Sequence, residues 1–277
     1  MAMIDLAAPV DPLPKVWDPE MRIGDMLRGK RGLVVGVANE NSIAFGCASK
    51  LRAFGADIGL TYGDEKSERF VRPLAEQIQA DFLLPMNVER PGEMAAVFEH
   101  IRETWGGLDF VIHSIAFAPR ADLHGRVVDC SLEGFQQAMR ISCYSFIEMA
   151  RLAEPLMSEG GALLTMSYYG ADKVVNHYNV MGPVKAALEA TTRYLAVELG
   201  EKGVRVFAVS PGPLKTRAAS GIDHFDELVA AAVARSPGHR LVDIAEVGRV
   251  VAFLVGGGAS GMSGDTIYVD AGLHNVA

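Results

Sequence analysis

Short apolar runs alternate with longer amphipathic stretches through most of the chain. Seven apolar runs are typical of strands buried in a parallel sheet, at residues 32–37, 57–62, 82–86, 109–113, 162–166, 204–210 and 266–269. Helical spacing of apolar residues predicts helices over residues 43–54, 91–105, 131–157, 178–199 and 243–254, with Ser131 and Asp243 as expected N-caps. The alternation predicts an α/β fold with a doubly wound, Rossmann-like sheet of seven parallel strands.

The chain shows no internal division between residues 30 and 272, where no linker, repeat or low-complexity segment occurs. Its 277 residues, 49% of them hydrophobic, suffice for one large α/β domain. We therefore expect a single domain over residues 25–277, preceded by a proline-rich arm over residues 1–24. A stretch rich in Ala, Gly and charged residues, from about 214 to 240, is expected to form a lid over a pocket.

Composition excludes several classes of protein. The net charge is −8, and lysine and arginine are scattered singly, which argues against a nucleic-acid partner. Cys47, Cys130 and Cys143 are too few and too far apart for a disulfide framework or a zinc site. No apolar run reaches the roughly 18 residues of a membrane span, and the first residues lack the pattern of a signal peptide. We expect a cytoplasmic protein without a metal.

The first predicted strand ends in a turn that suits a nucleotide. Gly36 lies near the end of this strand, Ser42 ends the turn, and Ile43 opens the next helix. Glycine lets the backbone approach a phosphate, and a helix N-terminus offers free N–H groups and the positive end of a dipole. The spacing of Gly36 and Gly46 is not G-x-G-x-x-G. Two interpretations therefore remain: a pyrophosphate site, or an ordinary turn between a strand and a helix.

Acidic residues follow the second predicted strand. Asp64 and Glu65 lie where a carboxylate hydrogen-bonds the ribose of adenosine and repels a 2′-phosphate. They favour NAD over NADP, although the neighbouring Lys66 weakens this inference. The alternative is that they are acids of a surface loop.

A tyrosine and a lysine lie seven residues apart on the fourth of these predicted helices. This spacing is close to two helical turns, so Tyr178 and Lys185 are expected to share one face. An ammonium beside a phenol favours the phenolate and lowers the pKa of the tyrosine, which makes the pair a candidate acid. Tyr168 follows the preceding strand and can face the same space. Such pairs also occur on helices without any catalytic role.

Five stretches, in this order along the chain, are similar to those of a known family: Gly36–Gly46, His113–Pro119, Ser142–Phe146, Tyr178–Lys185 and Gly212–Ile222. The chain resembles the short-chain dehydrogenase/reductase superfamily and, more closely, its bacterial enoyl-[acyl-carrier-protein] reductase branch. The resemblance covers about residues 27–272. Ketone reductases of the superfamily have lysine four residues after the tyrosine. Here that position is Gly182 and lysine comes at 185, which favours an enoyl C=C bond.

The resemblance implies reduction of trans-2-enoyl-[acyl-carrier-protein] thioesters by NADH in fatty acid biosynthesis, with NADPH less favoured. Tyr178 would stabilise the enolate, Lys185 would hold the nicotinamide ribose, and Tyr168 would be the second active-site tyrosine. Ala118 would lie near the acyl chain. A homotetramer is also implied. The cofactor-binding residues would be Gly36, Ser42, Ile43, Asn87, Val88, Ile115, Lys185, Leu214, Lys215, Thr216, Arg217 and Ala218.

Three departures from the family pattern matter. Asn87 stands where the branch commonly has aspartate beside the adenine, and Gly63 replaces a larger polar side chain near the ribose. Pro183 sits inside the predicted active-site helix, where its missing N–H favours a kink between Tyr178 and Lys185. The alternatives to the enoyl reductase are a reductase of another activated C=C or C=O bond and an inactive nucleotide-binding relative. The presence of both tyrosines and the lysine argues against the latter.

Overall fold

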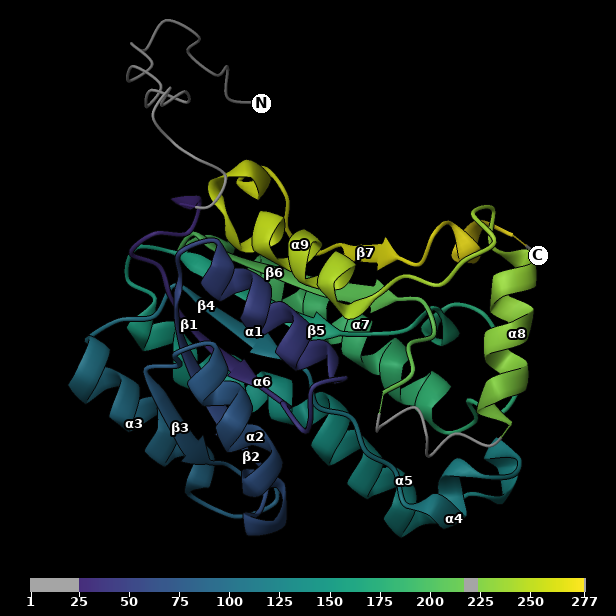
Figure 1. Cartoon of the computed structure of the whole chain (residues 1–277). Coiled ribbons are helices and arrows are strands. Elements are labelled where there is room, and N and C mark those ends of the chain that lie inside the picture. Colours follow the sequence, from purple (N-terminus) through teal and green to yellow (C-terminus); the bar gives the residue numbers. More distant parts are fainter. Residues whose placement is uncertain (1–24, 217–223, 277) are drawn as a thin grey trace, which may run out of the picture.

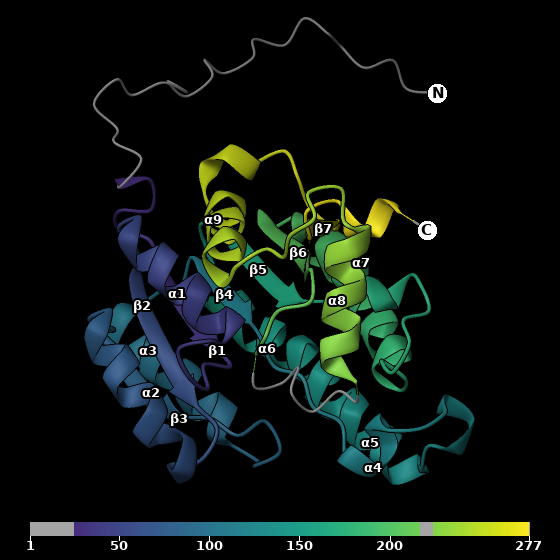
Figure 2. The ribbon, with the colours of Figure 1, turned by 45° about the vertical axis from the view of Figure 1, so that its right-hand side comes forward.

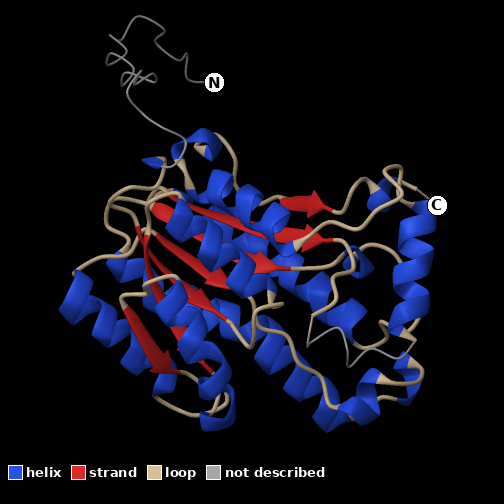
Figure 3. Cartoon of the chain, in the orientation of Figure 1, coloured by secondary structure: helices blue, strands red, loops and turns tan. Residues whose placement is uncertain are grey.

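The computed structural model describes residues 25–216 and 224–276. In this part of the chain seven parallel strands form one sheet in the order β3-β2-β1-β4-β5-β6-β7, shown in Figures 1 and 3. The strands are β1 Arg31–Val35, β2 Asp57–Tyr62, β3 Phe82–Pro85, β4 Phe110–His113, β5 Gly161–Met166, β6 Val204–Pro211 and β7 Thr266–Val269. The strand order reverses between β1 and β4, as in doubly wound sheets. The predicted fold class is confirmed.

Helices cover both faces of the sheet (Figure 2). They are α1 Ile43–Ala53, α2 Glu65–Gln77, α3 Glu93–Trp105, α4 Arg120–Leu123, α5 Leu132–Met139, α6 Ser145–Ala153, α7 Met181–Gly200, α8 Phe225–Arg235 and α9 Ile244–Val255. Strand residues alternate between two cores because successive side chains point to opposite faces. Val34 packs with α1, α2 and α9, whereas Leu33 and Val35 pack with α3, α6 and α7.

Glycines bring α1 and α9 into close contact. A Cβ on Gly248 would lie 2.5 Å from the carbonyl oxygen of Gly46, and a Cβ on Gly46 would lie 2.5 Å from that of Ile244. We therefore expect Gly248→Ala to lower the free energy of unfolding by about 1–3 kcal/mol, because the helices must move apart. Urea unfolding measures this. Gly200→Ala is the control, since a Cβ there meets nothing within 4 Å; an equal loss in both variants would contradict the argument.

A helix that the sequence patterns did not predict follows β2. Residues 65–77 form α2, and Asp64 is its N-cap: the carboxylate accepts a hydrogen bond from the N–H of Ser67 at 2.7 Å, and the Ser67 hydroxyl bonds back to Asp64. This capping box is a general start signal for a helix. The Asp64 carboxylate therefore has a structural role in the chain, which weakens its interpretation as a ribose ligand.

The single long helix predicted over residues 131–157 is interrupted. α5 and α6 are separated by a π-helical turn over Arg140–Tyr144, and a short 3-10 turn over Glu154–Leu156 ends the segment. The expected caps are present: Ser131 accepts from the N–H of Gly134, and Asp243 from that of Glu246. The π-helical turn changes which side chains face the end of β4.

The remaining predicted segments are described in part. Residues 1–24, the expected arm, and residues 217–223, which include Arg217 and Ala218, lie outside the described residues. α8 occupies the second half of the expected lid. Among the helices of residues 25–216 and 224–276, none has the length and apolar character that a membrane span requires.

Candidate active site

Most of the predicted site residues lie where strands end at one edge of the sheet. Gly36 follows β1, Asn87 and Val88 follow β3, Ile115 and Ala118 follow β4, Tyr168 follows β5, and Leu214, Lys215 and Thr216 follow β6. The strands are parallel, so their carboxyl ends share one edge. Ligands of doubly wound sheets bind at this edge, at the point where the strand order reverses.

The turn after β1 is shaped by its contact with β4. Gly36 has φ +103°, and a Cβ there would lie 2.0 Å from the carbonyl oxygen of Ser114, so only glycine allows this approach. Ser42, the N-cap of α1, makes no side-chain capping bond, and the first turn of α1 contains no acid. The Ser42 hydroxyl instead donates to the carbonyl of Asn39 at 2.5 Å. The N-terminus of α1 therefore keeps N–H groups for an anion such as a pyrophosphate.

Asn87 is held in the turn after β3. Its N–H donates to the carboxylate of Glu93 at 2.7 Å, and its side-chain oxygen accepts from the N–H of Glu89 at 2.9 Å. The amide nitrogen of the side chain remains a potential donor. A Cβ on Gly63 would meet nothing within 4 Å, so the missing side chain leaves open space at the end of β2. These two departures from the family pattern leave the edge of the sheet accessible.

Polar residues that sequence reasoning did not assign to the site brace the loop after β4. The Ser142 hydroxyl, in the π-helical turn, accepts from the N–H of Phe117 at 2.9 Å and donates to its carbonyl at 3.1 Å. The ring of His113 bonds to the hydroxyls of Thr165 and Ser145, each at 2.8 Å. Burial, with a contribution from Lys185, lowers the pKa of His113 to about 3. The available signals were a polar residue inside an apolar pattern and the family-like stretches His113–Pro119 and Ser142–Phe146.

Tyr178 does not lie on α7, contrary to the prediction. The helix begins at Met181, and Tyr178 occupies the preceding turn between His177 and Asn179, whose φ angles are +64° and +46°. The side chain of Asn179 anchors this turn by donating to the carbonyl of Leu123 at 2.7 Å. Tyr178 and Lys185 are both buried, but Tyr178 lies in this turn and only Lys185 lies on α7, so helical spacing does not relate them.

Pro183 does not break the active-site helix. It is the third residue of α7, in the first turn, where backbone N–H groups lack a partner within the helix in any case. Its missing N–H therefore removes no bond from α7. Pro183 therefore gives no reason to expect a kink between Tyr178 and Lys185.

An apolar cluster surrounds the two tyrosines. The rings of Tyr168 and Tyr178 meet edge to face with centroids 4.8 Å apart. Tyr178 is 7% exposed and packs in a buried cluster with Leu123 and Met181, against which Ala118 and Tyr168 also pack. The structure thus brings Ala118 together with both tyrosines. This apolar wall suits an acyl chain.

Two buried hydroxyls lack partners in the described part of the chain, the Oη of Tyr168 and the Oγ of Ser210. Ser210 lies near the end of β6. Buried polar groups are normally hydrogen-bonded, so such atoms at the ligand edge of a sheet suit contact with a bound molecule. Together with the open N-terminus of α1, they fit a dinucleotide and its substrate.

Lys185 is 4% exposed, and its Nζ donates to the carbonyl of Met166 at 2.6 Å. An ammonium has three donors, so it can bind ribose hydroxyls as well. Burial lowers its pKa to about 8, against the opposing influence of Cys143 and Glu189. Burial raises the pKa of Tyr178, and the charge of Glu189 raises it further. The expectation that Lys185 lowers the Tyr178 pKa is wrong, because these two influences dominate.

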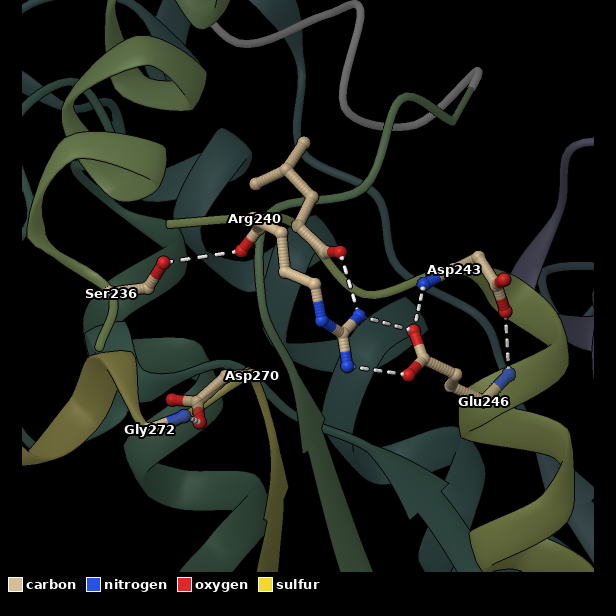
Figure 4. Close-up of polar contacts among 7 residues, drawn as sticks. Ser236, Arg240, Asp243, Glu246, Asp270 and Gly272 are labelled. Carbon is tan, nitrogen blue, oxygen red and sulfur yellow. Dashed lines mark hydrogen bonds and ion pairs between the residues drawn. The ribbon is translucent and has the colours of Figure 1, made fainter. Parts of the chain in front are cut away.

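One ion pair joins the residues after β6 to α8, and another joins the residues after α8 to α9. Lys215 forms an ion pair with Asp226 of α8 at 3.8 Å. Beyond α8, the guanidinium of Arg240 makes two bonds of 2.8 Å to the Glu246 carboxylate (Figure 4). These bonds, with the N–H of Asp243, lower the pKa of Glu246 to about 2. The expected lid is thereby anchored to α9.

A polar cavity of about 380 Å³ adjoins this anchor and contains none of the predicted site residues. Its lining includes Arg240, Arg249, Tyr268, Asp270 and His274. Asp270 and His274 bond to each other at 2.9 Å, and the His274 ring stacks on Tyr268. In the described ranges, no three His, Cys, Asp or Glu side chains are grouped as metal ligands would be.

Comparison with known proteins supplies the family. A family model described as enoyl-(acyl carrier protein) reductase matches residues 36–274. The enoyl-[acyl-carrier-protein] reductase [NADH] FabI of Rickettsia felis is 43% identical over 249 residues, which are 90% of this chain and 96% of that protein. The Rhizobium meliloti enoyl-[acyl-carrier-protein] reductase [NADH] 1 is 45% identical over 251 residues, or 91% of this chain and 92% of the relative.

Solved structures agree. The Anaplasma phagocytophilum reductase, solved in complex with NAD, has 45% identity and a TM-score of 0.89, covering 93% of this chain and 98% of its own. The Bacillus cereus enzyme, solved with NADP⁺ and an indole naphthyridinone, has 42% identity and a TM-score of 0.89, covering 91% and 99%. The fold, the arrangement of the strand-end residues and these matches agree, and the chain belongs to the enoyl-[acyl-carrier-protein] reductase family.

Proposed function

We propose that this protein reduces trans-2-enoyl-[acyl-carrier-protein] thioesters to saturated acyl thioesters with NADH, in fatty acid biosynthesis. The observation that carries the proposal is the contact between the buried Tyr178 and the half-buried Tyr168 against an apolar wall. Lys185 is bonded to the backbone two residues before Tyr168. This arrangement supplies a neutral phenol as donor, a hydroxyl without a partner in the described residues, and a cation for the cofactor.

NADH, when bound, supplies the hydride that reaches the β-carbon of the substrate. Negative charge then develops on the thioester oxygen as an enolate. Tyr178 donates a hydrogen bond to that oxygen, and a donor placed where charge appears lowers the barrier. The proton that completes the α-carbon comes from Tyr178 or from water. The chain thereby orients the substrate and stabilises charge, and the cofactor carries the redox step.

Different residues at the sheet edge bind different parts of NADH in this proposal. The open N-terminus of α1, with Gly36, Ser42 and Ile43, receives the pyrophosphate. Lys185 binds the nicotinamide ribose. The remaining proposed contacts come from residues that follow β3, β4 and β6 in the sequence: Asn87, Val88, Ile115, Leu214, Lys215, Thr216, Arg217 and Ala218. NADH is preferred to NADPH in this proposal, with Ala118 placed against the acyl chain.

Gly182 supports an enoyl substrate over a ketone. This position is four residues after Tyr178, where ketone reductases of the superfamily have their lysine. A Cβ on Gly182 would lie 3.2 Å from the carbonyl oxygen of Gly170, so a side chain there is crowded against the turn that follows Tyr168. The amine of the site therefore comes from Lys185, one helical turn further along α7.

The proposed setting is the cytoplasm, with acyl carrier protein delivering the substrate to a homotetramer. Large apolar side chains on the outside of α7 support assembly: Tyr194 is 73% exposed and Val197 is 80% exposed. Exposed apolar surface of this kind commonly marks contact with another chain. Analytical ultracentrifugation of the purified protein gives the number of subunits directly.

The test of the proposed function is a substrate comparison. We expect NADH oxidation, followed by its loss of absorbance, with a trans-2-enoyl thioester of acyl carrier protein, and slower oxidation of NADPH. A 3-oxoacyl thioester serves as the parallel substrate. Oxidation with the 3-oxoacyl substrate alone would show that the protein is a ketone reductase instead.

A further inference from the structure

One carboxylate joins three elements beneath the active site. Glu189 lies on α7, one helical turn after Lys185, and accepts a hydrogen bond from the hydroxyl of Ser167. Thr266, at the start of β7, also bonds to it through its side chain. Ser167 directly precedes Tyr168, and its N–H donates to the carbonyl of Val209 at 2.7 Å. Glu189 therefore connects α7, the end of β5 and β7 at the point where the Tyr168 turn begins.

The same carboxylate acts on both groups that are needed as donors. Its charge raises the pKa of Tyr178 and opposes the lowering of the Lys185 pKa by burial. A negative charge favours the protonated form of each group. Tyr178 can donate to the thioester oxygen only as a phenol, and Lys185 holds ribose hydroxyls best as an ammonium. Glu189 therefore favours the working form of both.

We propose that Glu189 is a positioning residue of this active site, which holds the Ser167–Tyr168 turn against α7 and keeps Tyr178 and Lys185 as hydrogen-bond donors. This inference rests on the proposed reductase function. Glu189 itself touches neither the reacting atoms nor the cofactor in this proposal, and it acts through Ser167, Tyr178 and Lys185.

The groups around Glu189 determine the pH at which its carboxylate becomes protonated. Burial raises its pKa most, and the hydrogen bonds from Ser167 and Thr266 oppose this. The charge of Arg193 on α7 also lowers the pKa, and that of Asp172, after Tyr168, raises it slightly. Tyr268 on β7 also faces the carboxylate. Glu189 becomes neutral as the pH falls through its raised pKa, so its influence is present above that pKa and is lost below it.

Two substitutions separate the two roles. Glu189→Gln keeps an acceptor for Ser167 but removes the charge, so Lys185 and Tyr178 lose their protons at lower pH. We expect the alkaline limb of the kcat/KM profile to move down by about one pH unit. The pH at which the Kd for NADH begins to rise, measured by fluorescence titration, should fall by the same amount. Ser167→Ala keeps the charge but frees the turn, and should lower kcat about tenfold without moving the limb.

Controls make the outcomes distinct. Glu198→Gln removes the same charge from an exposed site on α7 and should leave the profile unchanged. Glu189→Asp keeps the charge but has a shorter side chain that reaches Ser167 less well. It should therefore lower kcat without moving the alkaline limb, as Ser167→Ala does. This variant replaces Glu189→Gln in the comparison if the glutamine variant does not fold. An alkaline limb and Kd profile in Glu189→Gln that match the wild type overturn the inference. A wild-type protein that neither binds NADH nor reduces an enoyl thioester overturns the proposed function instead.

Discussion

Replacing Tyr178 with phenylalanine is expected to lower kcat/KM for an enoyl thioester about 10²- to 10³-fold, the usual cost of losing one donor to a developing oxyanion. The buried hydroxyl is protonated at neutral pH, because burial and Glu189 raise its pKa. Its removal leaves the ring, and so the apolar packing with Tyr168, in place. Steady-state kinetics with a saturating concentration of NADH measure the loss.

The matched control for this variant is Tyr194→Phe. Tyr194 is on α7 and is 73% exposed, and phenylalanine keeps the ring that is proposed to contact another chain, so removing the hydroxyl should leave activity unchanged. The Kd for NADH should be nearly unchanged in both variants. An unaltered kcat/KM in Tyr178→Phe would remove this hydroxyl from the chemistry and leave Tyr168 as the candidate donor.

Lys185→Met is expected to weaken NADH binding and to lower kcat/KM about 10²- to 10³-fold, since a buried charge-assisted contact to the ribose is lost. The free energy of unfolding should not fall, because methionine fills similar space without the cost of burying an ammonium. Fluorescence titration with NADH and urea unfolding give the two results. Lys202→Met, at an exposed ion pair with Glu154, is the control.

The wild-type pH profile follows from the same residue. Burial lowers the pKa of Lys185 to about 8, so the ammonium is present below that pH and is lost as the pH rises through it. Wild-type activity should therefore decline on the alkaline side near pH 8, and this limb should be absent from the residual activity of Lys185→Met. The same alkaline limb in both proteins would assign it to another group.

Much of this arrangement follows from local patterns. Each strand is a short apolar run, and a strand that is buried on both faces needs no long-range information to be recognised. Ser131 and Asp243 cap their helices as expected because an N-cap bonds only to residues two or three positions away. The placement of Ala118 and Tyr168 after their strands follows in turn, since parallel strands end at one edge.

Helix boundaries near the site were less predictable. Tyr178 matched a helical period but lies in a turn, because Asn179 is anchored by the carbonyl of Leu123, 56 residues earlier in the chain. Pro183 was therefore expected in the second turn of the helix, whereas it lies in the first turn of α7. In the π-helical turn over Arg140–Tyr144, Ser142 bonds to Phe117, and Ser145 directly after the turn bonds to His113. Periodicity does not contain such contacts.

By itself, the sequence determined the succession of strands along the chain, most of the long helices, the fold class and the candidate tyrosines and lysine, since these depend on periodicity, caps and motifs within short windows. The tertiary structure alone decided the electrostatics. Spacing favoured a low pKa for Tyr178, yet burial and the carboxylate of Glu189 raise it. The free-energy cost of burying a charge depends on all the groups packed around it. Around these residues the groups belong to β5, β7 and α7, which are far apart in the sequence.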